Sequence, residues 1–284
     1  MADDSYRLII SCPDTVGIAA AVSHFIADQG GLITEANQYR DPVSNWFFMR
    51  QVISAQSLPY SAGELYQRFE PIAKKFQMEW RVTDTRQLKK VVLMTSKQSH
   101  CLSDLLYRWR SHELKFNIPC VISNHSDLSD YVKWHQIDYL HLPSDNDKDA
   151  HFAAVGQALE KADPDIIVLA RYMQVIPPHL CEKYAGKMLN IHHSFLPAFV
   201  GAKPYHQAAA RGVKLIGATC HFVTTELDAG PIIEQDVVRI SHHDSIEDLT
   251  RKGKDVEKTV LARGLRNHLE DRVLIHGNKT IVFE

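Results

Sequence analysis

The sequence predicts an α/β protein made of a small ferredoxin-like domain followed by a larger domain with a mostly parallel, Rossmann-like sheet. Two observations predict this division. Residues 1–85 follow the order strand, helix, strand, strand, helix, strand, which is the ferredoxin-like (βαββαβ) pattern. From Lys90 onward, short apolar strands alternate with helices, as in parallel sheets that are covered on both faces. The length of 284 residues suits domains at 1–85 and 86–284.

Local signals place each element of the first domain. Residues 6–11 form a short apolar strand, and Pro13-Asp14-Thr15 supplies turn and cap residues before a helix at 17–29. Gly30-Gly31 ends that helix. The remaining elements are strands at 32–39, 46–53 and 78–83 and an amphipathic helix at 61–76.

The second domain is predicted from its alternation of strands and helices. Strands are expected at residues 90–95, 117–123, 138–141 and 166–170, and helices at 103–109, 130–134 and 148–161. Two later strands, 215–222 and 232–240, look like antiparallel additions to the sheet. A charged amphipathic helix at 245–268 and a hairpin at 273–283, turning at Gly277-Asn278, complete the chain.

Composition excludes several classes of function. The 32 Lys and Arg residues nearly balance the 34 Asp and Glu residues, so the basic footprint of a nucleic-acid-binding protein is missing. The sequence shows no secretory signal and no apolar run of membrane-spanning length, so we expect a cytoplasmic protein without membrane contacts. Five scattered cysteines without a CxxC pair predict reduced, buried thiols, and no metal-binding spacing is present. The turn at 95–100 also lacks the glycine fingerprints of dinucleotide sites and P-loops.

The segment Asp14-Thr15-Val16-Gly17-Ile18, directly after the first strand, resembles the ACT domains, which are small regulatory modules that bind amino acids. The resemblance implies an effector site at Asp14, Gly17 and Ile18 for an amino acid such as glycine or methionine. It also implies a homo-oligomer, a dimer or tetramer, built partly through this domain. The alternative is that Asp14 caps a helix and that Gly17 permits close packing.

The residues with the clearest chemistry follow the end of a predicted strand in the second domain. Asn190-Ile191-His192 places an amide and an imidazole on the same side of the chain, at a strand end where open α/β sheets bind ligands. Asp228 lies in the loop Asp228-Ala229-Gly230-Pro231 beyond a strand that contains His221. An amide, an imidazole and a carboxylate can together polarise a carbonyl group and move a proton. Each residue alone has an ordinary structural interpretation, as a turn residue or a packed strand histidine.

Asn190-Ile191-His192 with Ser194, Leu196 and Pro197, followed at a long interval by Asp228-Ala229-Gly230-Pro231, resembles the formyltransferase family that uses 10-formyltetrahydrofolate. The resemblance implies that Asn190, His192 and Asp228 are catalytic. His221, on a neighbouring strand, either orients Asp228 or is a packed strand histidine. The resemblance further implies that residues 170–176 form the folate pocket. The donors and the base already supply polarisation and proton transfer, so we expect no metal and no tightly bound cofactor. The implied substrate-binding residues are Arg171, Met173, Gln174, Val175, Ile176, His193, Gly201 and His221.

Within this family, three details favour water as the acceptor of the formyl group. His193 stands where the ribonucleotide transformylases usually carry Pro, and Ser96-Lys97-Gln98-Ser99-His100 replaces their glycine-rich phosphate loop. The ACT-like module ahead of the formyl domain is the arrangement of the hydrolytic members. The expected reaction is therefore hydrolysis of 10-formyltetrahydrofolate to tetrahydrofolate and formate. The alternatives are formyl transfer to a small amine and a non-catalytic sensor of folate or amino acids.

Overall fold

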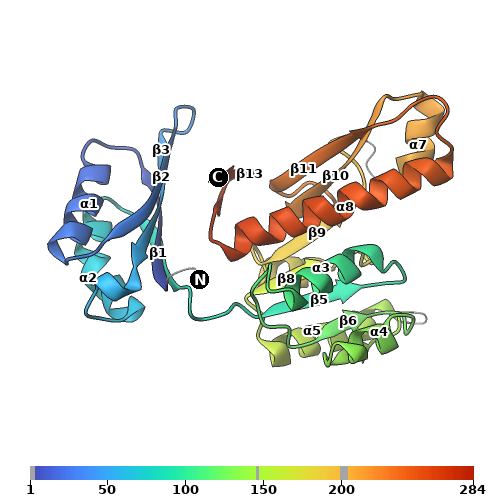
Figure 1. Ribbon diagram of the computed structural model, residues 1–284, viewed down its shortest axis with the longest axis horizontal. Coiled ribbons are helices and arrows are strands. Elements are labelled where there is room, and N and C mark those ends of the chain that lie inside the picture. The colour runs from blue at the N-terminus through green and yellow to red at the C-terminus, as the bar shows by residue number, and fades with distance from the viewer. Residues whose placement is uncertain (1–3, 145–146, 199–203) are drawn as a thin grey trace. The chain divides into compact units, whose positions relative to one another are not determined.

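The computed structural model describes residues 4–144, 147–198 and 204–284, and the chain divides into two compact units (Figure 1). The first unit runs to Leu88 and includes Glu270–Leu274 and Ile281–Glu284. The second unit comprises Lys89–Leu269 and Ile275–Thr280. In the described residues, no helix is long and apolar enough to cross a membrane.

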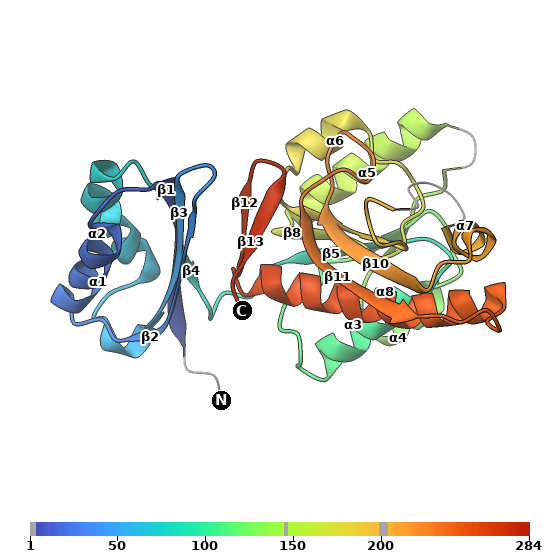
Figure 2. The ribbon, with the colours of Figure 1, turned by 90° about the horizontal axis from the view of Figure 1, so that it is seen from above.

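The first unit is built on an antiparallel sheet with two helices on one face (Figure 2). The strands lie in the order β2-β3-β1-β4, which confirms the ferredoxin-like prediction. Apolar side chains of α1 and α2 pack on β1 and β3 in one core cluster. The elements are β1 (Ser5–Pro13), α1 (Ile18–Asp28), β2 (Ile33–Asp41), β3 (Trp46–Ser54), the short 3₁₀ helix η1 (Ala55–Ser57), α2 (Ala62–Lys75) and β4 (Glu79–Asp84).

The C-terminal segment covers the other face of this sheet. Ile9 and Phe48 are buried against Leu274 and Phe283. The strand β1 is therefore buried on both faces, which explains its continuous apolar run where a half-exposed strand would alternate. The sequence analysis placed residues 270–284 in the second domain, whereas most of them pack with the first unit in the structure.

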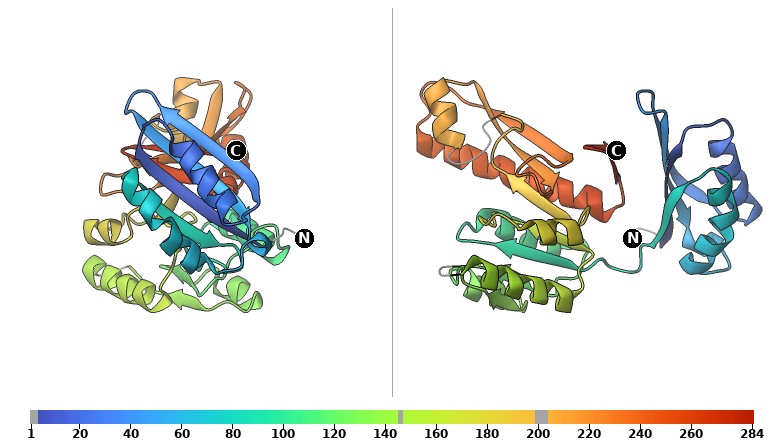
Figure 3. Two further views of the ribbon diagram at one scale, coloured as in Figure 1. Left: turned by 90° about the vertical axis from the view of Figure 1, so that its left-hand side faces the viewer. Right: turned by 180° about the vertical axis from the view of Figure 1, so that it is seen from behind.

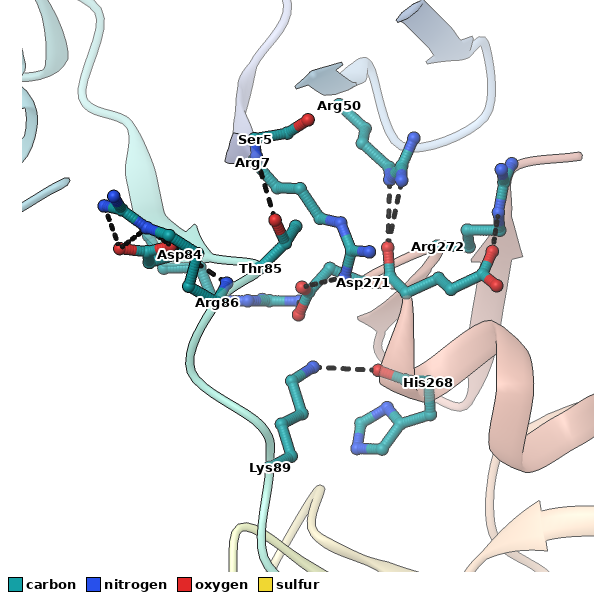
Figure 4. Close-up of polar contacts among 12 residues, drawn as sticks. Ser5, Arg7, Arg50, Asp84, Thr85, Arg86, Lys89, His268, Asp271 and Arg272 are labelled. Atoms are coloured by element: carbon teal, nitrogen blue, oxygen red, sulfur yellow. Dashed lines mark hydrogen bonds and ion pairs between the residues drawn. The ribbon is translucent and has the colours of Figure 1, made fainter. Parts of the chain in front are cut away.

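Buried charges hold the same segment in place. Arg7 donates to Asp271 over 3.2 Å, and Asp271 is only 3% exposed (Figure 4). Arg50, which is also buried, donates through Nε and a terminal nitrogen to the backbone oxygen of Glu270 at 3.2 and 3.1 Å. Buried charges are tolerated only when they are paired or hydrogen-bonded, so these contacts fix the segment on the sheet.

The start of α1 differs from the interpretation of Asp14 as its cap. The residue before the helix is Gly17, with φ of 96°, and no side chain caps the helix. Asp14 instead pairs with Arg40 on β2. A side chain at Gly17 would meet open space, so glycine serves the left-handed backbone there and not close packing.

The second unit contains a seven-stranded sheet in the order β11-β10-β9-β8-β5-β6-β7. Strands β5 to β9 are parallel, while β10 and β11 are antiparallel additions, as predicted. The strands are β5 (Val91–Thr95), β6 (Val121–Ser123), β7 (Tyr139–His141), β8 (Ile166–Leu169), β9 (Met188–His192), β10 (Leu215–Phe222) and β11 (Ile232–Arg239). The mostly parallel α/β prediction is confirmed.

Helices cover both faces of this sheet. Apolar residues of α5 and α6 pack on one face, while α8 packs against α3 and lies along β10 and β11 on the other (Figure 3). The helices are α3 (His100–Arg110), α4 (Ser129–Trp134), α5 (Lys148–Ala162), α6 (Pro178–Lys183), α7 (Pro204–Arg211) and α8 (Ile246–Leu269). The predicted C-terminal hairpin is present as β12 (Val273–His276) and β13 (Lys279–Val282).

Candidate active site

Two adjacent strands bring together the polar residues that the sequence singled out. Asn190 and His192 lie on β9, and the antiparallel register pairs Asn190 with His221 on β10. The side-chain nitrogen Nδ2 of Asn190 is 3.2 Å from Nε2 of His221. Strand pairing alone therefore places an amide beside two imidazoles at the end of β9.

The loop after β10 folds back and carries Asp228 to this position. Asp228 has φ of 55°, a left-handed conformation that Asp tolerates better than most residues. A Cβ atom on Gly230 would lie 1.9 Å from the backbone oxygen of Phe222, so only glycine allows the loop to turn so tightly. The backbone N–H of Phe222 donates to Pro231 O at 2.9 Å and closes the turn.

Asp228 faces both histidines. Its Oδ2 lies 3.2 Å from His192 Nδ1, and its Oδ1 lies 3.7 Å from His221 Nε2. Burial by itself would raise the pKa of Asp228, but the hydrogen bond to His192 and the nearby charges of His192 and His221 outweigh it and hold this pKa well below its usual range. Asp228 is therefore an ionised carboxylate at neutral pH.

The hydrogen bonds also define the tautomers. Because Nδ1 of His221 is 2.9 Å from the backbone oxygen of Phe222, this nitrogen carries a proton. When the ring is neutral, its Nε2 accepts from Asn190, and the second amide hydrogen of Asn190 stays available to a ligand. His192 donates from Nδ1 to Asp228, and its buried Nε2 has no hydrogen-bond partner in the described ranges.

These residues line a cavity of about 490 Å³, which we call the main cavity. Its walls combine the polar group with apolar side chains, which is the usual composition of a small-molecule site. All of the predicted catalytic and substrate-binding residues line it except Gly201, which lies outside the described residues. The lining residues are Leu169, Arg171, Tyr172, Met173, Gln174, Val175, Ile176, Asn190, Ile191, His192, His193, His221, Val223, Thr224, Thr225, Glu226, Leu227 and Asp228.

Buried polar contacts fix the loop at 171–176 that forms one wall. The backbone N–H of Met173 donates to Ser96 Oγ at 3.0 Å, and this hydroxyl donates to Asn124 Oδ1 at 2.6 Å. Nε2 of His151 is 2.6 Å from the hydroxyl of Tyr172. The sequence analysis treated Ser96 as part of a βα turn and did not single out Asn124 or His151, because these contacts join distant segments.

A buried carboxylate anchors Arg171 beside the main cavity. Glu257 on α8 is 1% exposed and binds His100 Nε2 at 2.7 Å and the Tyr205 hydroxyl at 2.5 Å. Its Oε2 is also 3.5 Å from Nε of Arg171. Burial raises the pKa of Glu257, but these partners lower it below its usual value overall. Sequence reasoning missed Glu257, although an acidic residue four positions after Gly253 on the buried face of a helix is the signal that could have found it.

His193 lies between these groups in a neutral state. Burial, and then the positive charge of Arg171, lower the pKa of His193 to about 4. At neutral pH it offers one N–H donor and one acceptor nitrogen but no charge. His193 therefore shapes the wall of the cavity without competing with His192 for Asp228.

Among the described residues, one group of three metal-ligating side chains, His100, Cys101 and Glu257, has ligand atoms that all lie within 4.8 Å of one another. They fit a metal poorly. Burial keeps the pKa of the Cys101 thiol far above its usual value, and Arg171 already lies against Glu257. A buried guanidinium beside the shared carboxylate opposes a second cation there.

Comparisons with known proteins identify the family to which the chain belongs. The formyl transferase family profile matches residues 89–265. A formyltetrahydrofolate deformylase from Bacillus subtilis is 44% identical and covers 99% of this chain and 94% of its own length. The crystal structure of a formyltetrahydrofolate deformylase from Pseudomonas syringae is 60% identical with a TM-score of 0.99, covering 100% of this chain and 96% of that one.

A transformylase structure matches a smaller part of the chain. Glycinamide ribonucleotide transformylase 1 from Symbiobacterium toebii is 29% identical, with a TM-score of 0.66, and covers 69% of this chain and 95% of that one. The relatives that match nearly the whole chain carry the deformylase name instead. The chain therefore belongs to the formyl transferase family and, within it, to the formyltetrahydrofolate deformylases.

Proposed function

We propose that the protein hydrolyses 10-formyltetrahydrofolate to tetrahydrofolate and formate. The observation that carries this proposal is the contact of ionised Asp228 with His192, beside Asn190, in a cavity large enough for a pterin ring. Water adds to the formyl carbon, the bond from that carbon to N10 breaks, and N10 gains a proton. Formate leaves as an anion, and one proton passes to solvent.

Asn190 and His192 supply the donors that stabilise the oxyanion. Both residues line the main cavity, where the donors would be the free amide hydrogen of Asn190 and the Nε2 hydrogen of a doubly protonated His192. A donor of this kind typically lowers the activation barrier by about 3 kcal/mol. Asp228 stabilises the charge on His192 through its Oδ2.

Asp228 also positions the attacking water. Its Oδ1, 3.7 Å from His221, is beyond normal hydrogen-bond length and can accept from a water. A carboxylate with a depressed pKa is a weak base, so orientation of water is its larger contribution. As the C–O bond forms, the water proton becomes acidic and passes through Asp228 toward N10.

The remaining predicted residues bind the folate. Main-chain groups at Gln174 and Ile176 meet the pterin ring, while Met173 and Val175 contribute apolar wall. Arg171, His193, Gly201 and His221 complete the proposed substrate-binding set. The donors and the carboxylate already polarise the formyl group, so the proposed reaction needs no metal and no tightly bound cofactor.

The acceptor is tested by measuring formate release from 10-formyltetrahydrofolate with and without added amines. Purified protein alone should release formate and tetrahydrofolate in equal amounts, and glycine amide or an amino sugar should not increase the rate. A requirement for an amine would instead establish the formyltransferase alternative. If the protein binds folate but releases no formate, with or without an amine, it would be a non-catalytic sensor.

We also propose that residues 1–85 form an ACT regulatory domain. The C-terminal segments Glu270–Leu274 and Ile281–Glu284 pack with this domain. Asp14 and Gly17 lie at the turn before α1, whereas the side chain of Ile18 is buried in the core, so its backbone would meet the effector. The charge of Arg40 beside Asp14 suits an amino-acid carboxylate. The proposal includes assembly into a dimer or tetramer in the cytoplasm, where the five free cysteines stay reduced.

Glycine and methionine should therefore change the rate of hydrolysis, and Asp14→Asn should reduce that response. Replacing Asp14 weakens the effector turn by removing its ion pair with Arg40, while the second unit is untouched. The measurement is the rate at saturating folate over a range of each amino acid. Identical rate curves for the wild type and Asp14→Asn would contradict the proposed effector site.

A further inference from the structure

A second cavity adjoins the main cavity, and apart from Arg171 and His193 its residues have no part in the proposed hydrolysis. Its volume is about 250 Å³, roughly half that of the main cavity. Arg171 and His193 line both cavities, so the two are neighbours. The second cavity is lined by Gln98, His100, Arg171, His193, Tyr205, His206, Thr250, Lys254 and Glu257.

The charges of the second cavity favour an anion. Its single carboxylate, Glu257, is already bound by His100 and Tyr205 and lies against Arg171. Lys254 makes no ion pair with any residue in the described parts of the chain. The residues that line the second cavity therefore carry one positive charge in excess, which attracts an anion and repels a protonated amine.

Unused hydrogen-bond donors in the same wall also call for an acceptor. Nε of Arg171 lies 3.5 Å from Glu257 but makes no hydrogen bond within the described residues. Nδ1 of His100 is likewise buried without a partner there, and it becomes a second donor when the ring, whose Nε2 faces Glu257, is protonated. Buried donors without partners are costly. A small carboxylate, with two acceptor oxygens, can satisfy such donors and the charge of Lys254 together.

We propose that the second cavity binds formate after it leaves Asn190, His192 and Asp228. This inference rests on the proposed hydrolysis, which yields one small anion next to Arg171 and His193. A volume of about 250 Å³ accommodates formate with several waters, at about 30 Å³ for each water. Formate thus moves from the reacting group to Lys254 while tetrahydrofolate still fills the main cavity.

The test measures binding of ¹³C-formate to the folate-free protein by NMR line broadening at constant ionic strength. Lys254→Met should weaken formate binding about tenfold, because a charge-assisted contact is lost. Lys254→Arg should retain most of the affinity. The matched control is Lys258→Met, one turn further along α8, where Lys258 pairs with Asp255 at 2.8 Å and does not line the second cavity; it should bind formate as the wild type does.

Formamide provides the second control, since it matches formate in size but carries no charge. It should not displace formate. Equal formate affinity in Lys254→Met and the wild type, or displacement by formamide at similar concentrations, would overturn the proposal. Formate binding is measured without folate, so its failure and the failure of hydrolysis are separate results. A wild type that did not hydrolyse 10-formyltetrahydrofolate would refute the proposed function.

In turnover, formate should inhibit the wild type even at saturating 10-formyltetrahydrofolate. The reason is that formate in the second cavity does not exclude folate from the main cavity. The ratio of rates with and without formate is compared within each variant. Lys254→Met should lose most of this inhibition, and Lys258→Met should keep it; inhibition that saturating substrate abolishes would place formate in the main cavity and contradict the proposal.

Discussion

Asp228→Asn should slow formate release about a thousandfold while tetrahydrofolate still binds, since proton transfer and charge stabilisation by a positioned side chain contribute on this scale. Asparagine has the same shape and also tolerates the left-handed backbone at φ of 55°. The substitution therefore removes the charge that faces His192 without straining the loop. The measurement is kcat for formate release, compared with the dissociation constant for tetrahydrofolate.

A matched change in the same loop separates chemistry from loop structure. Glu226→Gln also neutralises a carboxylate that lines the main cavity, but Glu226 is exposed and has no proposed part in the reaction. It should lower kcat far less than Asp228→Asn. Near-normal turnover of Asp228→Asn would remove Asp228 from the mechanism, and equal losses in both variants would point to the loop instead of the carboxylate.

Local patterns were sufficient to predict most of the fold. The ferredoxin-like order and the parallel α/β sheet follow from short apolar strands, helix periodicity and glycine turns, which are all encoded locally. The covering of β1 by Leu274 and Phe283 was not predicted, because it joins the two ends of the chain. The uninterrupted run Leu8-Ile9-Ile10 was the one local sign of it, since a strand with one exposed face would alternate.

The candidate site was predicted in a different way. The spacing Asn190-Ile191-His192 follows from strand alternation, but the approach of Asp228 depends on a turn at Gly230 that spacing cannot position. The wall at 171–176 was found by family resemblance, whereas its supports, Ser96 and His151, lie far away in sequence. Buried contacts between distant segments are a property of the folded chain, so a single sequence does not reveal them.

The second large effect is expected for His192→Asn. This substitution should lower kcat by about a thousandfold and raise the pKa of Asp228. Asparagine can still donate to Asp228 from the position of Nδ1, but it lacks the Nε2 donor and the positive charge. Loss of an oxyanion donor alone costs about a hundredfold to a thousandfold. With the charge gone, burial opposes ionisation of Asp228 more effectively, so its pKa moves upward.

The sign of this shift is measurable in the resting protein by ¹³C NMR of the Asp228 carboxyl group. In the wild type the lowered pKa keeps Asp228 ionised down to about pH 4, which is near the ordinary pKa of an Asp side chain. The ionised form is lost only as the pH falls further. In His192→Asn the protonated form should appear at higher pH. An unchanged titration would show that His192 does not control the pKa of Asp228.

Because His192 and Asp228 act as a unit, the double variant His192→Asn with Asp228→Asn should be hardly slower than the slower single variant. Fully additive losses in kcat would show that the two residues act independently.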